Sequence, residues 1–143
     1  MAREHLIALG FGRHAIGRMI STGLLEEIHR GVYGIGPAKL TREGRWMAAV
    51  LAGGRDAALS HASAAALWQL LAHAAREIEV TSPRRRHSRH GLRFRFACLA
   101  ADEVITEDGI DVTTVARTLF DIAATEARRR VERAIHEANV RRR

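Results

Sequence analysis

Apolar residues near the start of the chain change from a helical period to an extended one. Within residues 13–22, Ile16, Met19 and Ile20 lie at i, i+3 and i+4, which places them on one stripe of a helix. The opposite side carries the polar and basic residues of the segment: Arg13, His14, Arg18 and Ser21. Gly23 ends this pattern, and residues 24–35 are rich in Ile, Val and Tyr with a break at Arg30-Gly31, where a hairpin reverses. A basic helix followed directly by a hairpin is the order of a winged helix-turn-helix, in which the helix enters the major groove and the wing lies along the phosphates.

The remaining pattern predicts a second, mixed region. We expect helices over residues 42–52 and 61–71, the first capped by Thr41, and strands over 57–60, 77–81 and 92–96. Residues 104–106 and 110–113 form a predicted hairpin with an Asp108-Gly109 turn, and two helical stripes follow within 115–122 and 131–138, with a frayed end at 141–143. The predicted fold is α+β: a winged helix-turn-helix over residues 1–38, then a small helix-and-antiparallel-sheet region over residues 39–143 packed on it.

The helix-turn-helix pair begins very close to the first residue. Residues 3–9 read as its first helix, yet trihelical DNA-binding cores normally have another helix before the pair, so that helix is expected to be missing here. Leu6 and Ile7 would each forgo about 1.5–3 kcal/mol if left in water. A downstream helix, a second copy of the chain or residues upstream of Met1 are the candidate covers.

The basic excess of the chain is concentrated in patches. The 143 residues include 23 Lys and Arg against 16 Asp and Glu, a net charge of +7, and Lys39 is the only lysine. Residues 81–98 carry six arginines and no acid, whereas residues 99–127 carry seven acids and one arginine. Binding to an anionic polymer explains such patches better than a general need for solubility does.

Cysteine content and hydropathy limit the class of protein. The single Cys98 excludes an internal disulfide, and its apolar strand-like setting predicts a buried thiol. No apolar run approaches the roughly 20 residues of a membrane span, and the amino terminus lacks the apolar core of a signal peptide. We therefore expect a cytoplasmic protein without a membrane partner.

Five motifs occur in a fixed order along the chain. They are HRGVYGIG, LTREGRWMAAVLAGG, ALSHASAAALWQL, IEVTSPRRR and DGIDVTTVARTLFDIA. This succession, from about Arg3 to about Asn139, resembles the AbiEi-type antitoxins of type IV toxin–antitoxin systems and relatives in which the same region precedes a Vsr-like endonuclease domain. The resemblance implies a winged-helix regulator that represses its own operon, with a following α/β region that counteracts a nucleotidyltransferase-like toxin. It assigns residues 13–22 to recognition and Arg30, Gly31, Val32 and Tyr33 to the wing.

Two basic surfaces are the candidate contacts with double-stranded DNA. The first is the recognition helix and wing, with Arg13, His14, Arg18, Ser21, Arg30 and Tyr33; Arg13 or Arg18 would pair with guanine, and Ser21 would reach a phosphate. The second is the loop at residues 83–90, with Arg84, Arg85, Arg86 and Arg89, which would give affinity and salt dependence but not sequence reading. A solvated helix face and a solubilising loop are the simpler alternatives, and RNA or an acidic toxin surface would suit the loop equally well.

Catalysis, metal binding and cofactor binding are not expected. His87 and His90 stand among arginines that repel a cation, and no Cys or carboxylate completes a ligand set. Ser60, His61 and Ser63 are explained by a helix start capped by Ser60, and Glu77 and Glu79 lack the nearby lysine of a restriction-type nuclease. No GxxxxGK[ST] loop is present, and Trp46 and Trp68 lie on apolar helical faces typical of a core.

Three functions remain open from the sequence. The leading one is a sequence-specific DNA-binding regulator of the antitoxin type. The second is a protein-interaction module that neutralises a toxin without binding DNA. The third is a truncated DNA-targeting module of a Vsr-like endonuclease.

Overall fold

The computed structural model describes residues 1–37, 39–72 and 77–141, and its contacts divide the chain into two compact units, Met1–Ala52 and Gly53–Arg143. The helix at residues 42–52 groups with the first unit, whereas the sequence pattern places residues 39–143 in the second region. That expected boundary falls on residue 38, and the expected frayed end includes residues 142 and 143; these three residues lie outside the described ranges.

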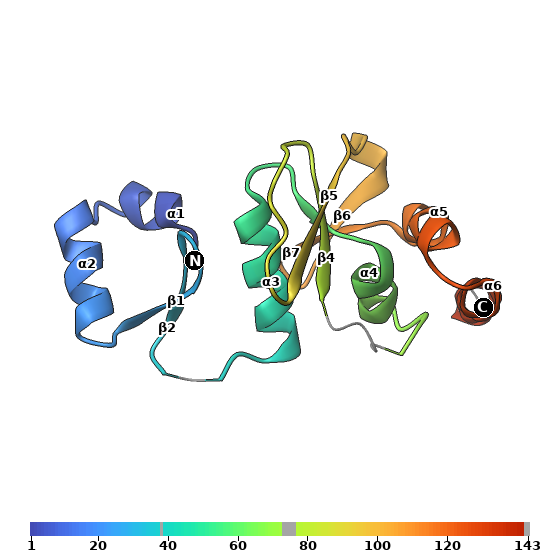
Figure 1. The fold of residues 1–143 in the computed structure, drawn as a ribbon, viewed down its shortest axis with the longest axis horizontal. Helices are drawn as coiled ribbons and strands as arrows, with labels where there is room; N and C mark the ends of the chain where they lie inside the picture. Colours follow the sequence, from blue (N-terminus) through green and yellow to red (C-terminus); the bar gives the residue numbers. More distant parts are fainter. Residues whose placement is uncertain (38, 73–76, 142–143) are drawn as a thin grey trace. The chain divides into compact units, whose positions relative to one another are not determined.

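The first unit opens with two short helices and a hairpin (Figure 1). They are α1 (Arg3–Ala8), α2 (Arg13–Ser21), β1 (Leu25–His29) and β2 (Val32–Ile35), close to the predicted bounds. β1 and β2 pair antiparallel, and the turn between them needs the left-handed conformation of Gly31, at φ 77°. Backbone hydrogen bonds also join the start of the chain to β2: the amide hydrogen of Tyr33 is donated to Met1 O at 2.8 Å, and that of Arg3 to Gly31 O at 2.8 Å.

The core of the first unit explains which apolar residues are covered. Leu6, Ile16, Leu25 and Tyr33 are buried against one another, with Met19 packed on them. Leu6 is therefore covered by α2 and the hairpin. Ile7, in contrast, is 58% exposed. We expected both Leu6 and Ile7 to be covered, and within the described residues only Leu6 is buried.

Helix α3 (Arg42–Gly53) follows the hairpin. Thr41 caps it as predicted, since Thr41 Oγ1 accepts the amide hydrogen of Gly44 at 3.0 Å. Trp46 is buried, and the guanidinium of Arg42 lies 4.9 Å from the centre of its ring. Trp46 is thus a core residue, as the apolar face predicted.

The second unit contains a five-stranded sheet in the order β5-β4-β3-β7-β6. Its strands are β3 (Ala58–Leu59), β4 (Ile78–Ser82), β5 (Leu92–Phe96), β6 (Val104–Glu107) and β7 (Ile110–Thr113). The α+β class predicted from the sequence is confirmed, and so is the β6–β7 hairpin, where Asp108 and Gly109 both adopt positive φ. The sheet is mixed, however: β3–β4 and β6–β7 are antiparallel, and β4–β5 and β3–β7 are parallel. The prediction of an antiparallel sheet is wrong for those two pairs.

The parallel pairing of β4 and β5 sets the course of the arginine loop. Ile78 pairs with Leu92 and Ser82 with Phe96, so residues 83–91 run back along the full length of β4 before β5 begins. Parallel strands usually need a longer crossover, often a helix. Here the return is short and is tied to β5, because the amide hydrogen of Phe94 is donated to Ser88 Oγ at 3.0 Å and that of Arg89 to Leu92 O at 2.8 Å.

Three helices of the second unit pack around a hydrophobic core: α4 (His61–Leu67), α5 (Val115–Thr125) and α6 (Arg128–Arg141). Ala65, Leu70, Leu71, Ile122 and Ala134 are buried together, and Trp68 packs on them. The indole of Trp68 also donates a hydrogen bond to Thr113 O at 2.8 Å. Gly53 has no side chain, which lets its backbone lie close to Ala57: a Cβ at position 53 would be 2.6 Å from the Cβ of Ala57.

Two further predictions concern exposure. Cys98 is exposed, so the buried thiol is wrong; β5 ends at Phe96, and the apolar run continues past the strand that would have covered it. Among the described helices, none is both long and apolar enough to cross a lipid bilayer.

Candidate functional site

Helix α2 turns one face to the core of the first unit and presents the other to solvent. Ile16 is buried and Met19 half-buried, whereas Arg13, His14, Arg18 and Ser21 are all exposed. Gly17 lies among them with open space where a side chain would stand. The exposed face therefore combines cationic side chains with a stretch of low relief, which lets the helix backbone approach a partner closely.

The tip of the wing is held by its own strand. The amide hydrogen of Gly31 is donated to Glu27 Oε1 at 2.8 Å, which fixes the turn next to the exposed Arg30. The exposed carboxylate of Glu26 stands on the same strand. The cationic part of the wing is thus its tip.

Tyr33 takes a different place from the one predicted. Its ring is 2% exposed within the core with Leu6, Ile16 and Leu25. Its hydroxyl accepts hydrogen bonds from Arg3 Nε at 3.2 Å and Nη2 at 2.9 Å. The side chain is buried in this core, so Tyr33 supports the hairpin from within and does not present a surface for DNA.

The arginine loop is exposed over residues 84–90, but its side chains differ in setting. The guanidinium of Arg85 lies 4.7 Å from the centre of the Phe96 ring, and Arg86 Nη2 lies beside Gly54. The backbone of Arg84 is held by Ser82 Oγ at 3.3 Å. All four predicted residues of this loop, Arg84, Arg85, Arg86 and Arg89, are brought to the surface of the second unit.

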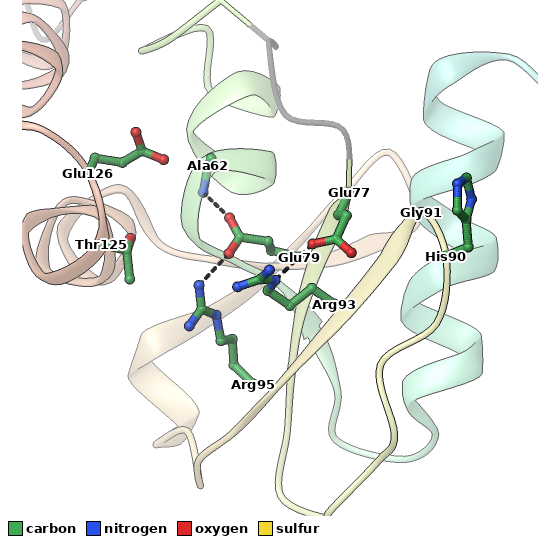
Figure 2. A pocket seen from close by; sticks show the side chains of 9 residues that line it. All are labelled: Ala62, Glu77, Glu79, His90, Gly91, Arg93, Arg95, Thr125 and Glu126. Carbon is green, nitrogen blue, oxygen red and sulfur yellow. Dashed lines mark hydrogen bonds and ion pairs between the residues drawn. The ribbon is translucent and has the colours of Figure 1, made fainter.

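A cavity of about 790 Å³ opens on the second unit near the start of β4 and β5 (Figure 2). Its lining pairs two carboxylates with two guanidiniums: Arg93 Nε is 2.9 Å from Glu77 Oε2, and Arg95 Nη2 is 2.8 Å from Glu79 Oε1. The other oxygen of Glu79 accepts the amide hydrogen of Ala62 at 3.1 Å. Each charge of these pairs is already balanced, so the cavity has no surplus charge on them to attract an ion.

The predicted cap of helix α4 by Ser60 is wrong, because Glu79 takes that role. Ser60 stands at the N-cap position but makes no side-chain cap bond, and the amide hydrogen of Ala62 is donated to the Glu79 carboxylate instead. Ser60 Oγ contacts His61 Nδ1 at 3.0 Å and accepts from Thr81 Oγ1 at 2.8 Å. A carboxylate from a neighbouring strand thus replaces the local cap that the sequence suggested.

A buried polar network extends from this cap to α5. His61 and Asp121 are 8% and 5% exposed, with His61 Nδ1 3.9 Å from Asp121 Oδ2. Asp121 Oδ1 accepts from Arg117 Nε at 2.8 Å, and Arg117 Nη1 reaches Glu103 Oε1 at 2.8 Å. Burial lowers the pKa of His61, against the opposing pull of Asp121 and Glu79, and burial of Arg117 is outweighed by its bonds to Asp121 and Glu103, which raise its pKa.

The network does not have the geometry of a Ser-His-Asp triad. In a triad the serine and the aspartate contact opposite nitrogens of the imidazole. Here both Ser60 Oγ and Asp121 Oδ2 face the same atom, His61 Nδ1. Nor do three His, Cys, Asp or Glu side chains converge as around a metal ion anywhere in residues 1–37, 39–72 or 77–141.

The model of the AbiEi antitoxin C-terminal domain matches residues 56–139. The chain belongs to the AbiEi antitoxin family. No curated protein matches the chain. The AbiEi match covers ALSHASAAALWQL, IEVTSPRRR and DGIDVTTVARTLFDIA, and with them the sheet, the arginine loop and the buried network of the second unit.

Membership in the AbiEi family assigns the chain a coarse role, that of the antitoxin in a toxin–antitoxin system. The matched range does not include α2 or the wing, so the likeness of residues 3–55 to AbiEi antitoxins stays a prediction.

Sequence reasoning missed the ionic partners of the AbiEi domain. Arg95, Arg117 and Asp121 were not singled out, although they complete the network around His61 and Glu79. The i, i+4 spacing of Arg117 and Asp121 on an amphipathic helix was the available signal. Nothing in the local pattern indicated that Asp121 would be buried.

Proposed function

We propose that this AbiEi antitoxin binds duplex operator DNA through α2 and the tip of the wing, and so regulates transcription of its own operon. The observation that supports it is the orientation of α2. Ile16 packs into the core with Leu25 and Tyr33, and the opposite face of the helix is exposed and cationic. A helix held in this way can enter a major groove with Arg13 and Arg18 forward.

The proposed roles follow from the chemistry of each side chain. A guanidinium donates two parallel hydrogen bonds to O6 and N7 of guanine, so Arg13 and Arg18 are the candidates for reading bases. His14 and Ser21 share the exposed face, and Arg30 at the wing tip suits a phosphate oxygen. Tyr33 no longer belongs to this set, because its side chain is buried.

Replacing Arg13 or Arg18 by alanine is expected to weaken operator binding by roughly 5- to 150-fold, since one bidentate pair with guanine contributes about 1–3 kcal/mol. Binding to random duplex DNA should fall much less. The measurement is fluorescence anisotropy with a duplex from the upstream region of its own gene and a shuffled duplex of equal length. Arg45→Ala removes an exposed arginine from α3 of the same unit and serves as the control. Equal losses on both duplexes would argue against base reading.

We further propose that the arginine loop neutralises phosphates of nucleic acid. Replacing Arg84, Arg85 and Arg86 together by alanine should flatten the plot of log affinity against log salt by up to about 0.9 for each phosphate that the loop no longer neutralises. Arg128→Ala, Arg129→Ala and Arg130→Ala together are the matched control, a second run of three arginines, on α6. An unchanged slope on the operator would mean that the loop has a different ligand.

The family also implies a toxin, and we infer that the second unit, which contains the matched residues 56–139, is the part that acts against it. The resemblance indicates a nucleotidyltransferase-like enzyme. Co-expression of the toxin with the double variant Arg13→Ala, Arg18→Ala separates the two roles. Neutralisation should persist after operator binding is abolished; loss of both together would place the two functions on one surface.

A further inference from the structure

Phe96 is a large aromatic residue on the surface of the second unit. It ends β5, an edge strand of the sheet, and its side chain is 56% exposed. Burying a phenylalanine stabilises a folded protein, so a ring on an exposed edge forgoes much of that gain. Aromatic rings presented singly at a surface are, in nucleic-acid-binding proteins, the platforms on which bases stack.

The charged residues near Phe96 in the sequence are basic, and two of them, Arg93 and Arg95, pair with Glu77 and Glu79. Residues 81–98 contain six arginines and no acid. One of them, Arg85, places its guanidinium 4.7 Å from the centre of the Phe96 ring. A guanidinium plane and an aromatic face together offer two flat surfaces that stack on any base.

The loop that carries four of these six arginines is tied to the sheet. Ser88 Oγ accepts the amide hydrogen of Phe94, Leu92 O accepts that of Arg89, and Ser82 Oγ accepts that of Arg84. Ser82 is also the strand residue that pairs with Phe96. The arginines therefore run beside β5 from the stacked ring to the beginning of the strand, and little loop ordering is left to oppose binding.

We infer that Phe96 and the arginine loop form a binding surface for single-stranded nucleic acid. One base stacks on the face of the Phe96 ring that Arg85 does not cover, and Arg84 and Arg89 contact phosphates of the same strand. This ligand uses both features of the surface. A duplex keeps its bases stacked inside, so it would use the arginines and leave the ring idle, and an acidic protein surface would offer no planar partner to the ring.

Single-stranded RNA and single-stranded DNA share this chemistry, and the test includes both. Labelled strands of roughly 12 nucleotides, as RNA, as DNA and as the corresponding duplex, are titrated with the full chain. Phe96→Leu keeps an apolar side chain but removes the π face, and it should weaken the binding of both single strands by roughly 5- to 150-fold, because one stacked base contributes about 1–3 kcal/mol. Duplex binding should change by less than about twofold, since a paired base is not available to the ring. Phe96→Tyr, which keeps the π face, should bind both single strands as tightly as the parent chain does.

The chain offers a matched control for the ring. Phe120 is 72% exposed and has Arg117 5.8 Å from its centre, but it lies in the acidic segment 99–127. Phe120→Leu should leave single-strand affinity unchanged. Equal effects of Phe96→Leu and Phe120→Leu, or no effect of either, would overturn the inference, as would displacement of the strand by poly-glutamate at equal charge.

The outcome is independent of operator binding. Arg18→Ala should leave the single-strand titration unchanged, because Arg18 is on α2 of the first unit. Cys98, the only cysteine, is exposed two residues past Phe96 and accepts a photocrosslinker there. Crosslinking to the single strand and not to the duplex would support the inference, and crosslinking to the duplex alone would contradict it.

Discussion

Arg117→Ala is expected to lower the free energy of unfolding of the second unit by about 3–5 kcal/mol, because it leaves a buried carboxylate without its cation. Asp121 is 5% exposed and Arg117 is 18% exposed. Nε of Arg117 donates to Asp121 Oδ1, and Oδ2 has no hydrogen-bond partner in the described structure, so Arg117 is the chief stabiliser of that charge. The same guanidinium holds Glu103, which connects α5 to the start of β6.

Tryptophan fluorescence makes this measurement specific to one unit. The chain has two tryptophans, Trp46 in the first unit and Trp68 in the second. Urea unfolding in a Trp46→Phe background therefore reports on the second unit through Trp68. Arg128→Ala is the control, since its ion pair with Glu132 is 91% and 57% exposed and should contribute less than about 0.5 kcal/mol. A loss below about 1 kcal/mol for Arg117→Ala would mean that Asp121 is neutral or solvated in the folded unit.

The elements of this protein could be predicted because each has a local signal. The helical stripe at 13–22, the Thr41 cap and the Asp108-Gly109 turn all depend on residues within a few positions of one another. The pairing of β4 and β5 does not. A two-residue hydrophobic period indicates which residues share a face of a strand. This period is the same whether the partner strand is parallel or antiparallel. The direction of β5 depends on the return path of residues 83–91, which the pattern does not describe.

The candidate surfaces divide in the same way. Exposure of Arg13, Arg18 and the arginines of residues 84–89 follows from charge, because an unpaired guanidinium is rarely buried. The network of His61, Glu79 and Asp121 depends on contacts between residues far apart in sequence, and only the structure brings them together. Tyr33 shows the limit within a single strand: it lies on β2 of the predicted hairpin, but the sequence pattern did not show that its side chain is buried.

Tyr33→Ala is expected to lower the free energy of unfolding of the first unit by about 3–5 kcal/mol. The ring is 2% exposed and packs with Leu6, Ile16 and Leu25, so its removal opens a cavity that this small core cannot fill. Arg3 is also deprived of the hydroxyl that accepts two of its hydrogen bonds. Folded proteins are stable by roughly 0.05–0.15 kcal/mol per residue, or about 3–8 kcal/mol for Met1–Ala52, so a loss of this size unfolds a large fraction of the unit. The unfolding is followed through Trp46 in a Trp68→Phe background.

Tyr33→Phe separates support of the wing from contact with DNA. The phenylalanine keeps the packing and removes only the hydroxyl, so the cost should be about 1–3 kcal/mol from the missing hydrogen bonds with Arg3. Because the side chain does not reach the surface, operator affinity of the folded variant should stay within about twofold of the parent chain. Tyr33→Ala would lose operator binding together with its fold. If Tyr33→Phe reduced operator affinity tenfold or more while the first unit kept its stability, the hydroxyl would have to leave Arg3 for the nucleic acid, and Tyr33 would return to the set of DNA contacts.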